Sequence, residues 1–299
     1  MKSTQLTLRR IKMKTNKTMN NLISVKSLSI LIIALCVGIL LSCSSGDVGS
    51  PDFNFSTGGI KFDDPKFTAK KTFDGDFPID NHIRVNVEAI KGEIVVTGQS
   101  DAQYVTVTAH LTVGSDTQED AELHLDDLDV LVTDGANEIL IQTVQPQNFD
   151  GRKYLVEYDI IVPKSFEVVA SQANGTIAIL DIQNTVEVSN KNGDVFLSGI
   201  VGGVTADVEN GGIEGTVVLP LNETIDLSVN NGGIELNIPT ATSAEFSATV
   251  DGVGEINVSD LDITDSVNTG KSLTGTLGNG EGSIVLSTVN GNIDIIGLD

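Results

Sequence analysis

Apolar and polar residues alternate on both sides of a recurring Asn–Gly pair in the second half of the chain. Around Asn231–Gly232, every second residue is apolar from Ile225 to Val229 and again from Ile234 to Ile238. A period of two is the pattern of a half-buried β-strand. The Asn–Gly pair tolerates the positive φ of a sharp corner. Each repeat is therefore predicted to contain two strands joined at a corner.

The corner glycines recur at a nearly constant spacing of 18 to 21 residues. The predicted corners are Gly175, Gly193, Gly211, Gly232, Gly252, Gly270 and Gly291. Five of these seven glycines directly follow Asn. Lys91–Gly92, much earlier in the chain, is a candidate first corner of the same kind.

Two architectures accommodate this repeat. Asn–Gly between alternating strands is a strong hairpin signal, so an antiparallel meander fits the local pattern. A fixed corner residue at a steady period favours an all-β fold, a β-solenoid (parallel β-helix-like) of about seven short coils. In a solenoid, the Asn side chains would form a ladder with a step of about 4.8 Å. We interpret this column as a row of turn caps in preference to a ligand or calcium site.

The preceding part of the chain is also rich in strand patterns but lacks the repeat. Alternating apolar residues occur around Val85, Ile94 and Val105, while an acidic stretch from Val113 to Asp129 indicates a short helix or a loop. We predict an irregular β-rich portion over 61–170 that caps the repeats of 171–299, because an open first coil would expose a hydrophobic end.

Three of these features together resemble a known family. They are the strand–glycine–strand element from Val85 to Val96, the segment from Tyr158 to Pro163, and the trailing Asn–Gly–x–Ile–x–Ile repeats. Over residues 80–297 the chain resembles the bacterial "putative-adhesin" family of β-strand-repeat lipoproteins, which is largely of unknown function. The resemblance implies a strand-repeat fold and a surface interaction role, and it implies no catalytic residue.

The first 42 residues differ from the rest of the chain. They carry seven basic residues and no acidic one, followed by an apolar run from Leu28 to Leu41. This is the pattern of a secretory signal, and the run is shorter than the roughly 20 residues of a membrane-spanning helix. Leu40-Leu41-Ser42-Cys43 resembles the bacterial lipobox. We predict a lipoprotein signal peptide over 1–42, a lipidated (palmitate-bearing) Cys43 and a flexible tether over 43–60. The alternative is an uncleaved signal anchor.

Charge and composition exclude two classes of protein. The chain has 18 Lys and Arg against 41 Asp and Glu, for a net charge of −23, so it lacks the clustered cations that bind nucleic acid. Its hydrophobic content of 40% is too high for a disordered acidic chain. Its only predicted membrane contact is the N-terminal lipid.

The sequence contains few residues in patterns that would indicate catalysis or metal binding. The three histidines are predicted to be solvated strand residues, namely His82, His110 and His124. Asp260, Asp262 and Asp265 are spaced suggestively, but they lack the glycine of a calcium loop. The chain has no nucleophile elbow or phosphate-binding loop. We therefore predict no enzyme activity, no cofactor and no metal site.

The favoured function is an adhesin-like binding or structural module of the bacterial cell envelope, anchored by lipid to the outer membrane and facing either side of it. Its ligand would be a glycan or a protein. The alternatives are a periplasmic accessory or sensing lipoprotein and, less favoured, a glycan-active β-helix enzyme, because residues 171–299 contain no Trp or Tyr for sugar stacking. Candidate binding rows are the acidic residues beside the corners: Glu187, Asp207, Asp226, Asp194, Glu214 and Glu235.

Overall fold

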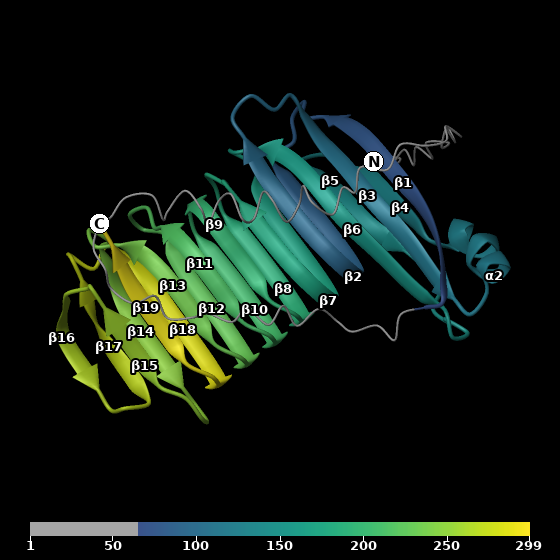
Figure 1. Cartoon of the computed structure of the whole chain (residues 1–299). Coiled ribbons are helices and arrows are strands. Elements are labelled where there is room, and N and C mark those ends of the chain that lie inside the picture. The colour runs from purple at the N-terminus through teal and green to yellow at the C-terminus, as the bar shows by residue number, and fades with distance from the viewer. Residues whose placement is uncertain (1–64) are drawn as a thin grey trace, which may run out of the picture. The chain divides into compact units, whose positions relative to one another are not determined.

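The computed structural model describes residues 65–299, which belong to one compact unit. Nineteen strands form a single hydrogen-bonded sheet that is mostly parallel (Figure 1). The helical elements of this part are the short helix α2 (Gln118–Leu123) and the 3-10 turn η1 (Leu125–Asp127). Neither of them has the length or the apolar character needed to cross a membrane.

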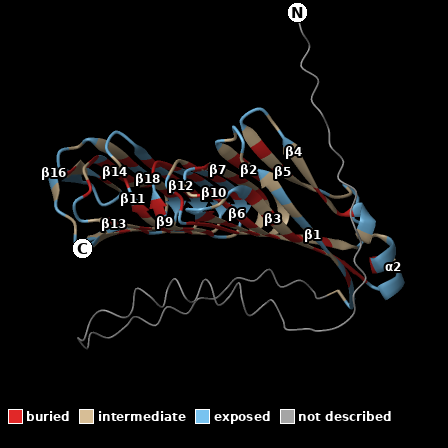
Figure 2. Ribbon diagram, turned by 90° about the horizontal axis from the view of Figure 1, so that it is seen from above, coloured by how far each residue is buried: buried red, intermediate tan, exposed pale blue. Residues whose placement is uncertain are grey.

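A line of glycines bends the sheet into two layers, which Figure 2 shows from above. The first layer contains, in spatial order, β4 (Asp129–Asp134), β5 (Glu138–Val144), the first half of β2 (Arg84–Gln99), the first half of β7 (Glu167–Leu180), β8 (Val186–Asn192), β10 (Val204–Asn210), β12 (Thr224–Asn231), β18 (Gly282–Asn290), β14 (Ala244–Val250), β17 (Ser272–Leu277) and β16 (Ile263–Asn268). The second layer contains β1 (Phe67–Pro78), β3 (Tyr104–Ser115), β6 (Lys153–Pro163), the second halves of β2 and β7, β9 (Val195–Val201), β11 (Ile213–Val218), β13 (Ile234–Pro239), β19 (Ile293–Leu298) and β15 (Ile256–Ser259).

The hydrophobic core lies between the layers and follows the alternation of the sequence. In β8, Val186 and Val188 are buried while Glu187 between them is exposed, and Val195 and Leu197 of β9 are buried from the other layer. Burying such an aliphatic side chain contributes about 1.5–3 kcal/mol. One continuous cluster of buried residues connects all the stacked strands.

The repeating element is a unit made of a first-layer strand, a corner glycine and a second-layer strand. Within residues 65–299 there are seven such units, formed by β2, β7, β8–β9, β10–β11, β12–β13, β18–β19 and β14–β15. The predicted all-β, parallel stacking is confirmed. The sheet, however, is not closed into a continuous solenoid.

The order of the units also departs from chain order at two places. The strands β3, β4, β5 and β6 separate the first unit from the second along the chain, although β2 and β7 pair directly. Near the other end, β18–β19 lies between β12–β13 and β14–β15. An expectation that each coil stacks on the one before it in sequence is therefore wrong here.

A side-chain contact accompanies the second rearrangement. Asn290 of β18 occupies the position of Asn231, and its Nδ2 donates to Asn231 Oδ1 at 3.1 Å. The β14–β15 unit instead places Val253 beside Gly291, with no amide to continue the ladder. Backbone hydrogen bonds are the same for any sequence, so the amide pair favours β18 as the neighbour of β12.

The early strands extend both layers beyond the first unit. The second layer continues through antiparallel β3 and β1, while the first continues through β5 and antiparallel β4. A hydrogen bond of 2.8 Å joins Thr143 Oγ1 of β5 to the Tyr158 hydroxyl of β6 across the core. Burial raises the pKa of Tyr158, which keeps this phenol protonated as a cross-layer partner. The predicted border at residue 170 lies within β7.

Candidate functional site

The corner glycines form a close-packed column. Gly175, Gly193, Gly211, Gly232 and Gly291 all have φ between +127° and +157°. A Cβ atom placed on any of them would collide with the carbonyl oxygen of the glycine in a neighbouring unit. Only glycine therefore fits, both because of its φ and because the backbones touch.

The remaining predicted corners lie elsewhere. Gly252 precedes the corner of the last unit, whose glycine is Gly254 with φ +150°. Gly270 lies in the turn between β16 and β17, where its N–H donates to Asn268 Oδ1 at 2.7 Å. Gly92, with φ +141°, forms the corner of the first unit, aligned with Gly175. The spacing from Gly232 pointed to Gly252, which follows Asp251, but the corner glycine lies two residues later, at Gly254.

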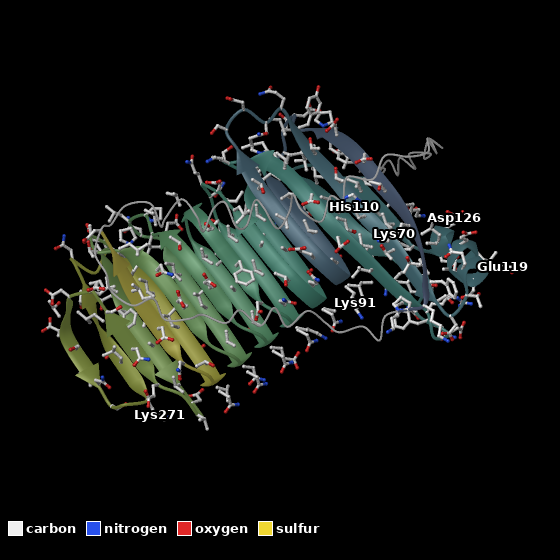
Figure 3. The ribbon with its side chains drawn as sticks, in the orientation of Figure 1. Lys70, Lys91, His110, Glu119, Asp126 and Lys271 are labelled. Carbon is white, nitrogen blue, oxygen red and sulfur yellow. The ribbon has the colours of Figure 1, made fainter. Side chains whose placement is uncertain are left out.

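An asparagine ladder runs along the outside of the corners, as predicted for stacked parallel units. Four Nδ2–H···Oδ1 hydrogen bonds of 3.1–3.2 Å form the ladder: Asn290 donates to Asn231, Asn231 to Asn210, Asn210 to Asn192, and Asn192 to Asn174. Lys91 occupies the next position beyond Asn174. Figure 3 shows Lys91 and Lys271 at opposite ends of this edge of the stack.

A second set of polar side chains closes the corners from the inside. The Gln172 amide donates to Gly92 O at 2.6 Å, and Asn190 Nδ2 donates to Gly175 O at 2.8 Å and Gly193 O at 3.0 Å. Thr288 Oγ1 donates to Gly232 O at 2.9 Å. These three side chains are buried because the carbonyl groups of the bent backbone need donors that strand pairing does not provide. Sequence reasoning missed them, since they interrupt an apolar row.

Lys271 caps the last corner. Its Nζ donates to Gly252 O at 2.9 Å and to Gly254 O at 2.8 Å, which are carbonyl groups that no further unit covers. An ammonium group with three donors suits this end of a column of carbonyls. The Lys271 ammonium group therefore already occupies the two carbonyl oxygens at this end of the stack.

The predicted acidic residues divide between the two layers. Glu187 and Asp226 share a row on the outside of the first layer but are separated by Thr205, and Asp207 lies one row away between Ser189 and Ser228. These first-layer carboxylates are therefore not direct neighbours.

The second layer brings three acidic residues into register on adjacent strands. Glu214 aligns with Glu235, and Glu235 aligns with Asp294, which the period-based prediction left out. We call these three residues the acidic row. Partial desolvation, followed by repulsion from Glu235 and Asp194, raises the pKa of Glu214. Asn257 extends the row by donating to Asp294 Oδ1 at 2.8 Å.

A further acidic group lies where β2 meets β6. Desolvation, with repulsion from Glu157 and Asp159, raises the pKa of Glu93. Desolvation also raises the pKa of Asp159, against the effect of nearby His110. The described residues contain no group of three or more His, Cys, Asp or Glu side chains suited to hold a metal ion.

The prediction of solvated strand residues is wrong for two of the histidines: His82 precedes β2 and its side chain is only 7% exposed, and His124 is the C-cap residue of α2. His82 Nε2 contacts Asp134 Oδ1 at 2.9 Å at the β4–β5 turn, and its Nδ1 contacts Ile79 O at 3.1 Å.

Two of the suggestively spaced aspartates, Asp260 and Asp265, have positive φ. This backbone conformation accounts for an aspartate at each position without a bound metal ion. Cys43 lies outside the described residues.

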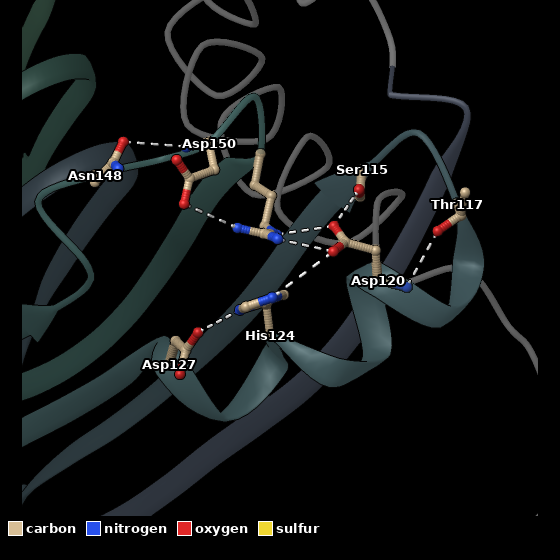
Figure 4. A network of polar contacts seen from close by, with 8 residues as sticks. Ser115, Thr117, Asp120, His124, Asp127, Asn148 and Asp150 are labelled. Atoms are coloured by element: carbon tan, nitrogen blue, oxygen red, sulfur yellow. Dashed lines mark hydrogen bonds and ion pairs between the residues drawn. The ribbon is translucent and has the colours of Figure 1, made fainter.

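The best-formed polar network attaches α2 to the sheet (Figure 4). The Arg152 guanidinium donates to both Asp120 carboxylate oxygens at 2.8 Å, and Ser115 Oγ donates to Asp120 Oδ2 at 2.5 Å. His124 Nδ1 lies 2.6 Å from Asp127 Oδ2. These bonds, Arg152 first and Ser115 second, lower the pKa of Asp120 to about 2.

This pKa shift predicts an acid dependence of stability. The folded pKa of Asp120 lies below its ordinary value of 3.8, so its contribution is complete above that value and is lost as the pH falls towards about 2. Asp120→Asn should lower the melting temperature at neutral pH, with a difference from the parent that vanishes near pH 2. Thermal unfolding followed by circular dichroism across this range would measure it. Asp116→Asn, at an exposed neighbouring position, is the control and should show no such difference. A difference for Asp120→Asn that persists at pH 2 would contradict the expectation.

No family model and no curated protein matches this chain. Solved structures of similar proteins do match. A "putative cell adhesion protein" from Clostridium sporogenes has 8% identity and a TM-score of 0.41, over 77% of this chain and 100% of that chain. A "putative adhesin" from Bacteroides fragilis has 14% identity and a TM-score of 0.25, over 78% and 99% respectively. A "putative lipid binding protein" from Parabacteroides distasonis has 11% identity and a TM-score of 0.27, over 77% and 97%.

The chain resembles proteins described as putative adhesins, a family without a defined function.

Proposed function

We propose that the protein is a lipid-anchored component of a bacterial cell envelope that acts as an adhesin-like binding or structural module. In this proposal a solenoid-like stack presents outward rows of side chains to a ligand. The lipobox-like segment ending at Cys43 supports the anchor. The descriptions of the neighbouring structures agree with the class of function.

The observation that carries the binding role is the acidic row. Glu214, Glu235 and Asp294 come from three adjacent parallel strands in register. Neighbouring strands lie about 4.8 Å apart, so the row repeats one chemical group at a constant step. An extended ligand with cationic or hydroxyl groups could meet several carboxylates at once, which adds affinity without requiring a deep pocket.

The first test addresses the anchor and the membrane face. The chain, carrying a C-terminal epitope, should incorporate labelled fatty acid and lose its epitope when intact cells are treated with protease. Cys43→Ala should remain as unlabelled precursor, because acylation precedes cleavage in the lipoprotein pathway. An epitope that is protected until the outer membrane is permeabilised would instead support a periplasmic accessory or sensing lipoprotein.

A second experiment tests whether the acidic row binds the ligand. Cells displaying Glu214→Gln/Glu235→Gln/Asp294→Asn should attach less to immobilised glycans or matrix proteins that the parent binds. The matched control is Glu187→Gln/Asp207→Asn/Asp226→Asn, which removes the same number of charges from carboxylates that are not direct neighbours. Equal losses in both variants would show that net charge, and not the acidic row, governs attachment.

A further inference from the structure

Asparagine–glycine pairs are reactive as well as structural. In such a pair the glycine backbone nitrogen can attack Asn Cγ. A C–N bond then closes a five-membered succinimide, the bond from Cγ to the side-chain nitrogen breaks, and ammonia leaves with the proton of the attacking nitrogen. Water opens the ring at either carbonyl to give aspartate or isoaspartate. Glycine permits the reaction because it has no Cβ to shield its nitrogen.

The described residues contain six Asn–Gly pairs, five of which belong to the asparagine ladder. The ladder restrains both reacting groups. Asn192 Nδ2 donates to Ala173 O at 3.0 Å and to Asn174 Oδ1 at 3.2 Å, while Gly193 N donates to Asn210 O at 2.8 Å. Asn192 also ends a strand, whose ψ of about +115° to +135° turns the next nitrogen away from the side chain.

The sixth pair, Asn279–Gly280, lies outside the ladder in the turn between β17 and β18. Asn279 is exposed, and its side-chain amide makes no hydrogen bond within residues 65–299. The turn is closed by Gly280 N donating to Leu277 O at 3.1 Å, and Ser243 Oγ accepts from the Asn279 N–H at 2.9 Å. Gly280 N is therefore hydrogen-bonded, as Gly193 N is, but no hydrogen bond within residues 65–299 holds the Asn279 side-chain amide. The freedom of this side chain to rotate towards the Gly280 nitrogen is what distinguishes the pair from those of the ladder.

We propose that Asn279 is a site of spontaneous deamidation on the folded protein and that the ladder protects the other five Asn–Gly pairs. The product places an additional carboxylate in a turn that already contains Glu281. Folded molecules therefore become more acidic at one turn with time, while the corner column remains intact.

The test follows all six sites in one sample. The purified full chain is incubated folded at mildly alkaline pH, and a second portion is incubated in denaturant. Peptide mapping by mass spectrometry, with isoaspartate methyltransferase labelling, reports each site. In the folded sample, Asn279 should react at least about tenfold faster than any ladder asparagine, since a ladder residue must in addition break its side-chain hydrogen bonds. In denaturant all six pairs should react at similar rates.

Two variants complete the design. Asn279→Gln should abolish the reaction at this turn without changing the melting temperature, because the longer side chain would have to close a less favourable six-membered ring. Asn279→Asp should co-elute on anion exchange with the acidic form that accumulates in the parent. An Asn279 that stays intact in folded protein while reacting in denaturant would overturn the proposed site. Ladder asparagines that react as fast as Asn279 in the folded sample would overturn the proposed protection.

Discussion

Gly193→Ala should destabilise the protein by about 2–5 kcal/mol, because the added methyl group combines strain at positive φ with a collision against neighbouring backbone. Gly193 has φ +127°, and a Cβ at this position would overlap the carbonyl oxygen of Gly175. The stacked backbone cannot move away without breaking strand pairing on both sides. Urea unfolding of the parent and the variant would measure the difference in free energy.

Gly270→Ala is the matched control for this experiment. Gly270 also has positive φ, +84°, but a Cβ there would meet no atom within 4 Å. Its cost should be limited to the conformational penalty of about 1–2 kcal/mol. Equal destabilisation by the two variants would mean that φ alone, and not the contact between glycines, accounts for the corner column.

Asn190→Asp should be the second strongly destabilising change, at about 3–5 kcal/mol near neutral pH, because it leaves a buried charge without a partner. Asn190 is 1% exposed, and its Nδ2 donates to both Gly175 O and Gly193 O. A carboxylate of nearly the same shape would face these two acceptors with no proton to donate. Burial should raise the pKa of the new acid, so the loss should shrink as the pH is lowered and the acid becomes protonated.

Asn192→Asp is the control that separates the effect of burying a charge from the effect of losing an amide donor. Asn192 is exposed in the outer ladder and also donates from its Nδ2 to two oxygens. Water can solvate a carboxylate there, so the expected cost is about 1 kcal/mol with a weak dependence on pH. Chemical denaturation of both variants at neutral and acidic pH gives the comparison. A larger loss for Asn192→Asp than for Asn190→Asp would contradict the importance assigned to the buried amide.

Sequence reasoning found those parts of the molecule that depend on neighbours along the chain. Alternation located the strands, and the Asn–Gly pairs located the outer ladder, which hydrogen bonds from Asn192 to Asn290 confirm. The buried Gln172 and Asn190 carried no such signal. Each looks like a polar interruption of an apolar row until the carbonyl group it satisfies is known.

The acidic row shows a different limit. Asp294 is 59 residues from Glu235 in sequence, yet the two side chains are neighbours in register. The predicted rows named Glu214 and Glu235 but omitted Asp294, although it too lies three residues after a corner glycine, Gly291. The signal lay in the equivalent position of each acidic residue after its corner, independent of the order of the units.

The sequence by itself determined the local conformation: the alternation that separates buried from exposed positions, and the glycines that permit the corners. Both follow from side-chain hydrophobicity and backbone φ within a few residues. The tertiary structure alone decided which unit lies beside which, including the placement of β18–β19 before β14–β15 and the use of Gly254 in place of Gly252 as a corner. The physical reason is that parallel strand pairing satisfies backbone groups equally well for any sequence. Neighbours are therefore selected by contacts such as Asn231 with Asn290, which exist only once distant segments meet.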